Sequence, residues 1–304
     1  MDQHLPSPSL GHEPLDFGRA FAIATVLNLA LVAAQVVYGI LANSVALLAD
    51  AGHNFGDALG LLLAWGAHTA GRWQPTHRYT YGFGSASILA SLTNSVMLLV
   101  ATGAIAWEAI LRFLEPEEVA GVTVMVVAGI GIVVNGISAW LLMAGTRTDM
   151  NIRGAFLHMI GDAAVSLAVV IAGGLILLTG WLWLDPLMSL VISVVIVAGT
   201  WGLLRDAIKL CLAAVPAGID PLKVRIYLEG LPGVTAVHDL HVWAVSTTET
   251  ALTCHLVMPK GHPGDAFLAD VSRQLHDHFD IGHPTLQIEL ADAETCAMAS
   301  GHMV

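Results

Sequence analysis

Apolar residues fill six stretches of the chain, each about 20 residues long or longer, and polar residues gather between these stretches and after the last one. A helix rises about 1.5 Å per residue, so about 20 apolar residues span the hydrocarbon core of a bilayer. The pattern therefore predicts six transmembrane helices. They are expected at Phe17 to Leu41, Ser44 to Thr69, Phe83 to Leu111, Val119 to Ala144, Gly154 to Thr179 and Pro186 to Leu212.

The composition supports this interpretation. Of the 304 residues, 56% are hydrophobic and 12% are charged, and the mean hydropathy is +0.72. A typical soluble domain contains about 25% charged residues. We therefore predict an integral membrane protein that lies in a lipid bilayer.

The charges of the connecting segments predict the orientation. Basic residues follow the second, fourth and sixth stretches, whereas the opposite connections are short and mainly acidic. Cytoplasmic loops carry an excess of Lys and Arg, so both chain termini are expected in the cytoplasm. These basic residues are Arg72, Arg78, Arg147 and Arg153 and, at or after the end of the sixth stretch, Arg205, Lys209, Lys223, Arg225, Lys260 and Arg273.

After Leu212 the pattern changes to that of a small soluble α+β domain. Its apolar periodicity predicts the order αββαβ, with helices at Pro221 to Leu231 and Asp265 to Phe279 and strands at Val234 to Val245, Thr250 to Met258 and Thr285 to Leu290. We therefore expect three parts: a cytoplasmic tail (1–16), a six-helix transmembrane domain (17–212) and a cytoplasmic metal-binding domain (213–304).

Two His-x-x-x-Asp pairs lie inside the apolar stretches. His53 and Asp57 form the first pair, and His158 and Asp162 form the second. Residues four apart share one face of a helix, so two facing pairs would offer two nitrogens and two oxygens to a tetrahedral ion such as Zn²⁺. The alternative is that these are polar side chains tolerated in buried helices. Ionisable groups inside the membrane usually serve a substrate or an ion pathway, and the repeat of the pair favours the metal site.

The C-terminal domain offers a second candidate metal site. It contains eleven acidic and four basic residues and eight of the fourteen histidines, which favours divalent cations and argues against nucleic acid. Neighbouring strands can bring His238, His255 and Glu289 together, and His283 lies just before the last strand. Surface histidines that bind no metal are the competing interpretation.

These residues resemble the cation diffusion facilitator family, in particular its zinc-transporting branch with bacterial cobalt-zinc-cadmium resistance proteins. The specific features are Leu47 to His53 (LLADAGH) with Asp57, His158 with Asp162, His238 to Trp243 (HDLHVW) and Thr285 to Glu289 (TLQIE). Ser85 and Ser87 replace an arginine and a glutamate often found in the family, and Gln287 replaces a histidine ligand of some members.

The resemblance implies a homodimer in a bacterial inner membrane that exchanges metal for protons. It also implies a transport site at His53, Asp57, His158 and Asp162, and a cytoplasmic site that uses His238, His255, His283 and Glu289.

We therefore expect a secondary transporter, not an enzyme, that exports Zn²⁺, and also Cd²⁺ or Co²⁺, by alternating access in exchange for protons. No resident cofactor is expected, and Zn²⁺ would be both substrate and regulatory ligand. A membrane-embedded zinc hydrolase would need an open coordination position and a general base, whereas four protein ligands close the shell. A metal sensor with a membrane anchor would not explain ligands inside two spans.

Overall fold

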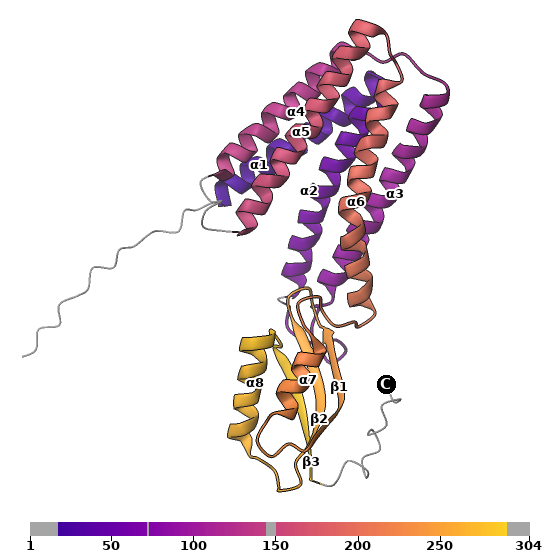
Figure 1. The fold of residues 1–304 in the computed structure, drawn as a ribbon. Helices are drawn as coiled ribbons and strands as arrows, with labels where there is room; N and C mark the ends of the chain where they lie inside the picture. Colours follow the sequence, from indigo (N-terminus) through magenta and orange to yellow (C-terminus); the bar gives the residue numbers. More distant parts are fainter. Residues whose placement is uncertain (1–17, 72, 144–149, 291–304) are drawn as a thin grey trace, which may run out of the picture. The chain divides into compact units, whose positions relative to one another are not determined.

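The computed structural model describes residues 18–71, 73–143 and 150–290, so the expected N-terminal tail (1–16) lies outside the described residues. Six long helices precede a small domain of two helices and three strands (Figure 1). The long helices are α1 (Gly18–Leu41), α2 (Val45–Gly71), α3 (Ala86–Leu114), α4 (Gly121–Leu142), α5 (Met150–Thr179) and α6 (Leu184–Cys211). The small domain contains α7 (Pro221–Glu229), β1 (Ala236–Ala244), β2 (Thr250–Val257), α8 (Asp265–Phe279) and β3 (His283–Glu289).

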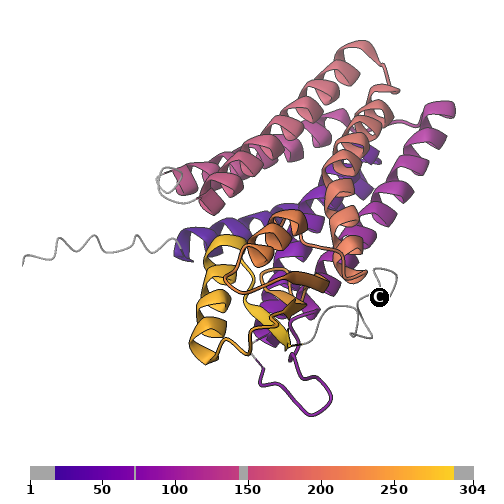
Figure 2. The ribbon, with the colours of Figure 1, turned by 60° about the horizontal axis from the view of Figure 1, so that its bottom comes forward.

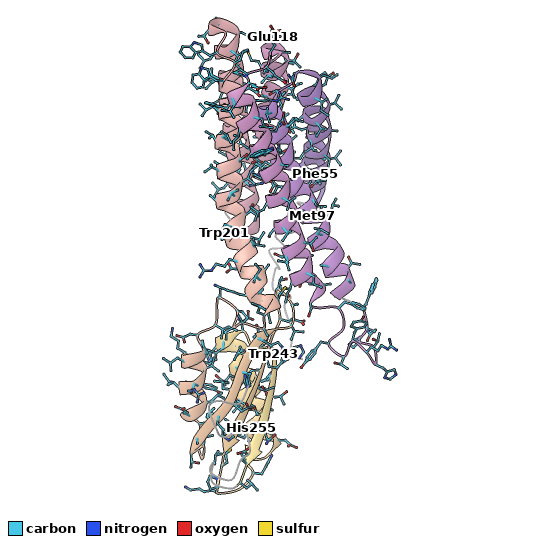
Figure 3. The ribbon with its side chains drawn as sticks, turned by 90° about the vertical axis from the view of Figure 1, so that its right-hand side faces the viewer. Phe55, Met97, Glu118, Trp201, Trp243 and His255 are labelled. Atoms are coloured by element: carbon cyan, nitrogen blue, oxygen red, sulfur yellow. The ribbon has the colours of Figure 1, made fainter. Side chains whose placement is uncertain are left out.

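Five of the described helices, α1, α3, α4, α5 and α6, are long and apolar enough to cross a membrane. Large apolar side chains project outward from them, as expected for helices that face lipid (Figure 3). The same holds for Phe55 of α2, which is exposed. Polar residues such as Asp50, Asn54 and Asp57 reduce the hydropathy of α2, which is not among the five.

The chain divides into two compact units. The first comprises Met1–Ala58 and Ala101–Ile196, and the second comprises Leu59–Val100 and Val197–Val304. In the first unit α4 packs along both α1 and α5. Small residues allow this close approach, because a Cβ atom at Gly121 would lie 2.9 Å from Cγ of Leu177.

In the second unit, the strands form one sheet in the order β1-β2-β3. β1 and β2 are antiparallel, whereas β2 and β3 are parallel, and α8 provides the crossover between them. Both α7 and α8 pack on the sheet (Figure 2). Val271 and Leu275, four residues apart on α8, join Leu252 and Leu256 of the central strand in one apolar core.

Local sequence explains where α7 begins. Asp220 is its N-cap and accepts a hydrogen bond from the backbone N–H of Leu222 at 3.0 Å, and Pro221 occupies the first helical position. Both residues are favoured at these places, because the cap satisfies a free N–H group and proline lacks one.

Candidate metal centres

The two His-x-x-x-Asp pairs face each other from α2 and α5 within the first unit. His53 Nε2 lies 3.3 Å from Asp162 Oδ1, and His158 Nε2 lies 3.0 Å from Asp57 Oδ2. Within each helix the two members of a pair are 3.7 Å apart. The four side chains therefore form a closed ring in which imidazoles and carboxylates alternate, and we call this the HD ring.

The members of the HD ring are buried to different degrees. Asp162 is 2% exposed and His158 is 41% exposed. Ligand atoms of His53, Asp57 and Asp162 lie within 4.8 Å of one another, a spacing that one metal ion could bridge. Nδ1 of His53 and Oδ2 of Asp162 are buried without a hydrogen-bond partner among the described residues, which leaves them available to an ion.

A buried polar network adjoins the HD ring. Asp50 Oδ2 accepts hydrogen bonds from Gln35 Nε2 on α1 at 2.5 Å and from Ser166 Oγ on α5 at 3.2 Å. Asn54 donates to Gln35 Oε1 at 3.1 Å. All four side chains are fully buried. Ser166 lies one turn beyond Asp162, and Asp50 lies one turn before His53, so the network adjoins both ligand-bearing helices. Sequence analysis did not identify this network, although Asp50 belongs to the quoted LLADAGH motif.

A second His/carboxylate cluster lies on the sheet of the small domain. The register pairs His238 with His255 across β1 and β2, and Val257 with Glu289 across β2 and β3. Glu289 lies 2.9 Å from His238 Nε2 and 2.8 Å from His255 Nδ1 through its two carboxylate oxygens. Ligand atoms of these three residues lie within 4.8 Å of one another, so they also suit one metal ion.

A β-bulge extends this cluster. The register shifts between His238 and His241, and Asp239 adopts a left-handed conformation with φ of 52°. Its carboxylate lies 3.0 Å from His241 Nε2 and 3.6 Å from His255 Nε2. In a regular strand Asp239 would point away from the face that carries His238, so the bulge explains why both can contact the same cluster. Sequence analysis did not identify Asp239 and His241 as site residues, because no residue in the run signals a bulge.

His283 is not brought to this cluster within the chain. It starts β3, whereas Glu289 ends it, and six residues of strand span about 20 Å. His283 Nε2 lies 3.9 Å from Glu249 Oε2, and its ring lies 6.2 Å from that of Tyr81. Its role as a ligand stays a prediction.

Cys254 precedes His255 on β2 but takes no part in either cluster. It faces the core, and burial raises the pKa of its thiol to about 12. A metal binds the thiolate form, so this cysteine is unsuited to ligation at neutral pH.

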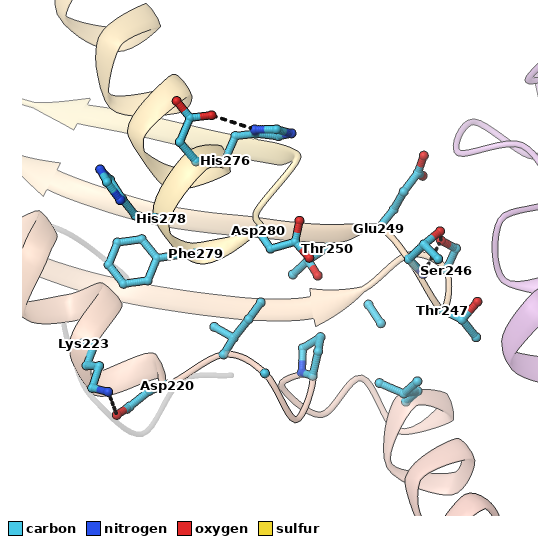
Figure 4. Close-up of a pocket in the computed structure, with 17 residues that line it drawn as sticks. Asp220, Lys223, Ser246, Thr247, Glu249, Thr250, His276, His278, Phe279 and Asp280 are labelled. Atoms are coloured by element: carbon cyan, nitrogen blue, oxygen red, sulfur yellow. Dashed lines mark hydrogen bonds and ion pairs between the residues drawn. The ribbon is translucent and has the colours of Figure 1, made fainter. Parts of the chain in front are cut away.

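A pocket of about 740 Å³ lies elsewhere in the second unit (Figure 4). It is lined by the end of α6, residues 216 and 218–220, Lys223 of α7, the β1–β2 hairpin and the end of α8. His276 and Asp277 pair at 3.0 Å at its edge. Among the described residues, this pair does not belong to a group of three metal-ligating side chains.

Two family descriptions match nearly all of the chain. "Cation efflux transmembrane domain" matches residues 21–211, and "Cation efflux protein, cytoplasmic domain" matches residues 216–291. The resemblance inferred from the motifs is therefore confirmed.

Several relatives match over most of their length. "Zinc transporter ZitB" of Escherichia coli is 37% identical over 94% of this chain and 92% of the relative. The "Cadmium, cobalt and zinc/H(+)-K(+) antiporter" of Bacillus subtilis is 34% identical over 84% of this chain and 83% of the relative. The solved metal-bound C-terminal domain of the CzcD transporter from Cupriavidus metallidurans is 36% identical, covers 24% of this chain and 100% of that domain, and has a TM-score of 0.22.

Proposed function

The chain belongs to the cation efflux family of membrane transporters, and on that premise we propose that it exports divalent cations, chiefly Zn²⁺, from the cytoplasm in exchange for a monovalent cation. The observation that carries the proposal is the HD ring. Two imidazoles and two carboxylates converge from two helices, and this donor set suits a small tetrahedral ion.

The chemistry of the ring couples metal to protons. A metal ion binds neutral imidazoles and ionised carboxylates, so an arriving ion displaces protons and arriving protons help to release it. Histidine titrates near pH 6.5 when unperturbed, which places this exchange in the physiological range. Alternating access would expose the ring first to the cytoplasm and then to the opposite side, with protons moving inward.

We propose that α2 also crosses the membrane, which brings the number of transmembrane helices to six. It is 27 residues long, enough to cross a bilayer, and its polar residues account for its lower hydropathy. Six crossings keep both termini on the same side. The distribution of Lys and Arg supports a cytoplasmic location for both termini. The bacterial relatives support a location in the inner membrane.

Relatives guide the choice of ions. One is named as a zinc transporter, and another as a cadmium, cobalt and zinc/H(+)-K(+) antiporter. We propose the same metal range here, with Zn²⁺ preferred. The name of the antiporter supports a monovalent counter-ion, either a proton or an alkali cation.

The cytoplasmic domain would bind Zn²⁺ as a regulatory ligand through His238, His255 and Glu289. The three side chains come from three strands, so one ion would join the edges of the sheet to its centre. The family resemblance supports a homodimer. A site that joins strands in this way could report the cytoplasmic metal concentration to the transport domain.

Transport by purified protein in vesicles tests the proposal. Zinc uptake driven by a pH gradient is expected for the wild type and is expected to be lost in Asp57→Ala, because three ligands hold the ion with the wrong charge and geometry. Glu115→Ala is the matched control, since Glu115 is an exposed carboxylate outside the HD ring. Equal zinc uptake by Asp57→Ala and Glu115→Ala would contradict the assignment of the ring. Hydrolysis of an added substrate, with no zinc flux, would instead favour a membrane hydrolase.

A further inference from the structure

Asp50 is a fully buried carboxylate that pairs with no Lys or Arg among the described residues. This residue of the first unit is 0% exposed. It accepts hydrogen bonds from the neutral groups of Gln35 and Ser166, and both reach the same oxygen, Oδ2. The other oxygen, Oδ1, has no hydrogen-bond partner among the described residues.

Around Asp50, the described residues contribute neutral groups and two members of the HD ring. α1 contributes Gln35, and α4 contributes Gly131, whose Cβ position would lie 2.9 Å from Ser166 Oγ. The titratable groups that act on Asp50 are His53 on its own helix and Asp162 on α5, both members of the HD ring. Among the described residues, no Lys or Arg forms an ion pair with this carboxylate.

An ionised carboxylate is costly in such a place. Burying an unpaired charge costs several kcal/mol or more, and intramembrane carboxylates therefore take up a cation or pair with one. Neutral hydrogen-bond donors reduce the cost without removing the charge. Among the described residues no Lys or Arg supplies this charge, and His53 belongs to the HD ring, so we take the compensating charge to be a small ion from solution.

We propose that the carboxylate of Asp50 binds the monovalent counter-ion, a proton or an alkali cation, that the protein exchanges for its divalent ion. This inference rests on the proposed transport function. Oδ1 of Asp50 is the free ligand atom. Oδ1 of Asn54, one turn away on the same helix, is also buried without a partner among the described residues, and it is the second oxygen that an alkali cation could use.

The position of Asp50 explains how the two ions would exclude each other. His53 follows it by one turn on α2, so a divalent ion in the HD ring brings two positive charges close to Asp50. Coulomb repulsion is strong where water is excluded, and it would expel a monovalent cation from Asp50. Conversely, a cation on Asp50 would weaken metal binding in the ring. Mutual exclusion of this kind is what exchange transport requires.

The experiment measures zinc binding to the full-length protein in detergent. Calorimetry in buffers with different protonation enthalpies gives the number of protons released per zinc bound, and repeating it with potassium or choline as the only monovalent salt gives the potassium sensitivity. The test variant is Asp50→Asn, which keeps the size of the side chain and removes the charge. Asn135→Ala is the matched control, because it removes another fully buried polar side chain, on α4, without removing a carboxylate. Protons released from the other sites cancel in the comparison with the wild type.

If Asp50 holds a proton, Asp50→Asn releases about one proton fewer per zinc than the wild type. This proton makes zinc affinity change about tenfold per pH unit, and the variant loses that contribution. If Asp50 holds an alkali cation, proton release is unchanged and the weakening of zinc binding by potassium disappears. Asn135→Ala is expected to behave like the wild type in both measurements. The proposal is wrong if Asp50→Asn matches the wild type in both, or if Asn135→Ala shows the same loss. Wild-type vesicles that carry no zinc would contradict the proposed function itself, whatever Asp50 binds.

Discussion

The carboxylate of Asp185, in the first turn of α6, caps the first turn of α2 at Val45. Oδ2 of Asp185 accepts a hydrogen bond from the backbone N–H of Val45 at 2.8 Å, and Oδ1 accepts one from the hydroxyl of Ser44. Asp185 is buried, so solvent does not replace these bonds. The charge lies beside the N-terminal ends of two helices, where helix dipoles favour an anion. This contact fixes the start of the helix that carries His53 and Asp57.

Removing this cap should destabilise the protein. We expect Asp185→Ala to lower the free energy of unfolding by about 1–3 kcal/mol, because buried N–H and hydroxyl groups lose their acceptor. Thermal unfolding in detergent measures the change. Asp206→Ala is the control, since Asp206 is exposed and lies 3.7 Å from Lys209 in a surface ion pair of small energetic value. Similar melting temperatures for the two variants would show that the cap contributes little.

Gly131 should tolerate no larger side chain, whereas Gly129 on the same helix should. A Cβ atom at Gly131 would lie 2.9 Å from Ser166 Oγ and 3.7 Å from Gln35 Nε2, and at Gly129 it would meet nothing within 4 Å. Ser166 could rotate away only by giving up its hydrogen bond to Asp50. We expect Gly131→Ala to cost about 1–3 kcal/mol and Gly129→Ala to be neutral or slightly stabilising. Unfolding measurements on both variants check this, and equal stability would mean that α4 can shift.

Residue spacing alone could predict which candidate ligands share a helix face. Helical geometry fixes which residues share a face, so His53 with Asp57 and His158 with Asp162 were expected to pair, and the structure places all four in contact. What spacing could not provide was the contact between helices, such as that of Gln35 with Asp50, which depends on how α1 packs beside α2.

Strand residues were harder to predict. The grouping of His238 with His255 and Glu289 follows from which strands are neighbours, and the expected order of elements led to it. Asp239 joins the cluster only because of a local bulge, which alternation along a regular strand does not anticipate. His283 lies just before the expected strand and starts the observed β3, at the end opposite to Glu289.

The cluster of His238, His255 and Glu289 should bind zinc independently of the HD ring. In the background of Asp57→Ala, which disables the ring, we expect the full-length protein to retain zinc that is lost on adding His255→Ala. His255 faces carboxylates through both ring nitrogens, 2.8 Å from Glu289 and 3.6 Å from Asp239, so its removal opens the cluster at its centre. Metal content after equilibrium dialysis is the measurement.

His276→Ala in the same background is the matched control. His276 also pairs with a carboxylate, Asp277, at 3.0 Å, but it is exposed and belongs to neither group of three candidate ligands among the described residues. We expect its loss to leave the bound zinc unchanged. Equal zinc content in the His255→Ala and His276→Ala proteins would argue that the sheet histidines are surface groups that bind no metal.

The donor set of the HD ring should determine which metal is carried. Nitrogen ligands favour Zn²⁺ over harder ions, whereas oxygen-rich shells suit Mn²⁺ and larger ions with higher coordination numbers. His53→Asp converts two nitrogens and two oxygens into one nitrogen and three oxygens and adds a negative charge. We therefore expect the variant to accept Cd²⁺ and Mn²⁺ better relative to Zn²⁺, by about tenfold if the difference is about 1.4 kcal/mol.

Competition of each ion with zinc uptake in vesicles measures the ranking. His77→Asp, the same substitution at an exposed loop position, is the control. A wild type that carries manganese as readily as zinc, or an unchanged ranking in His53→Asp, would mean that selectivity is set outside the ring.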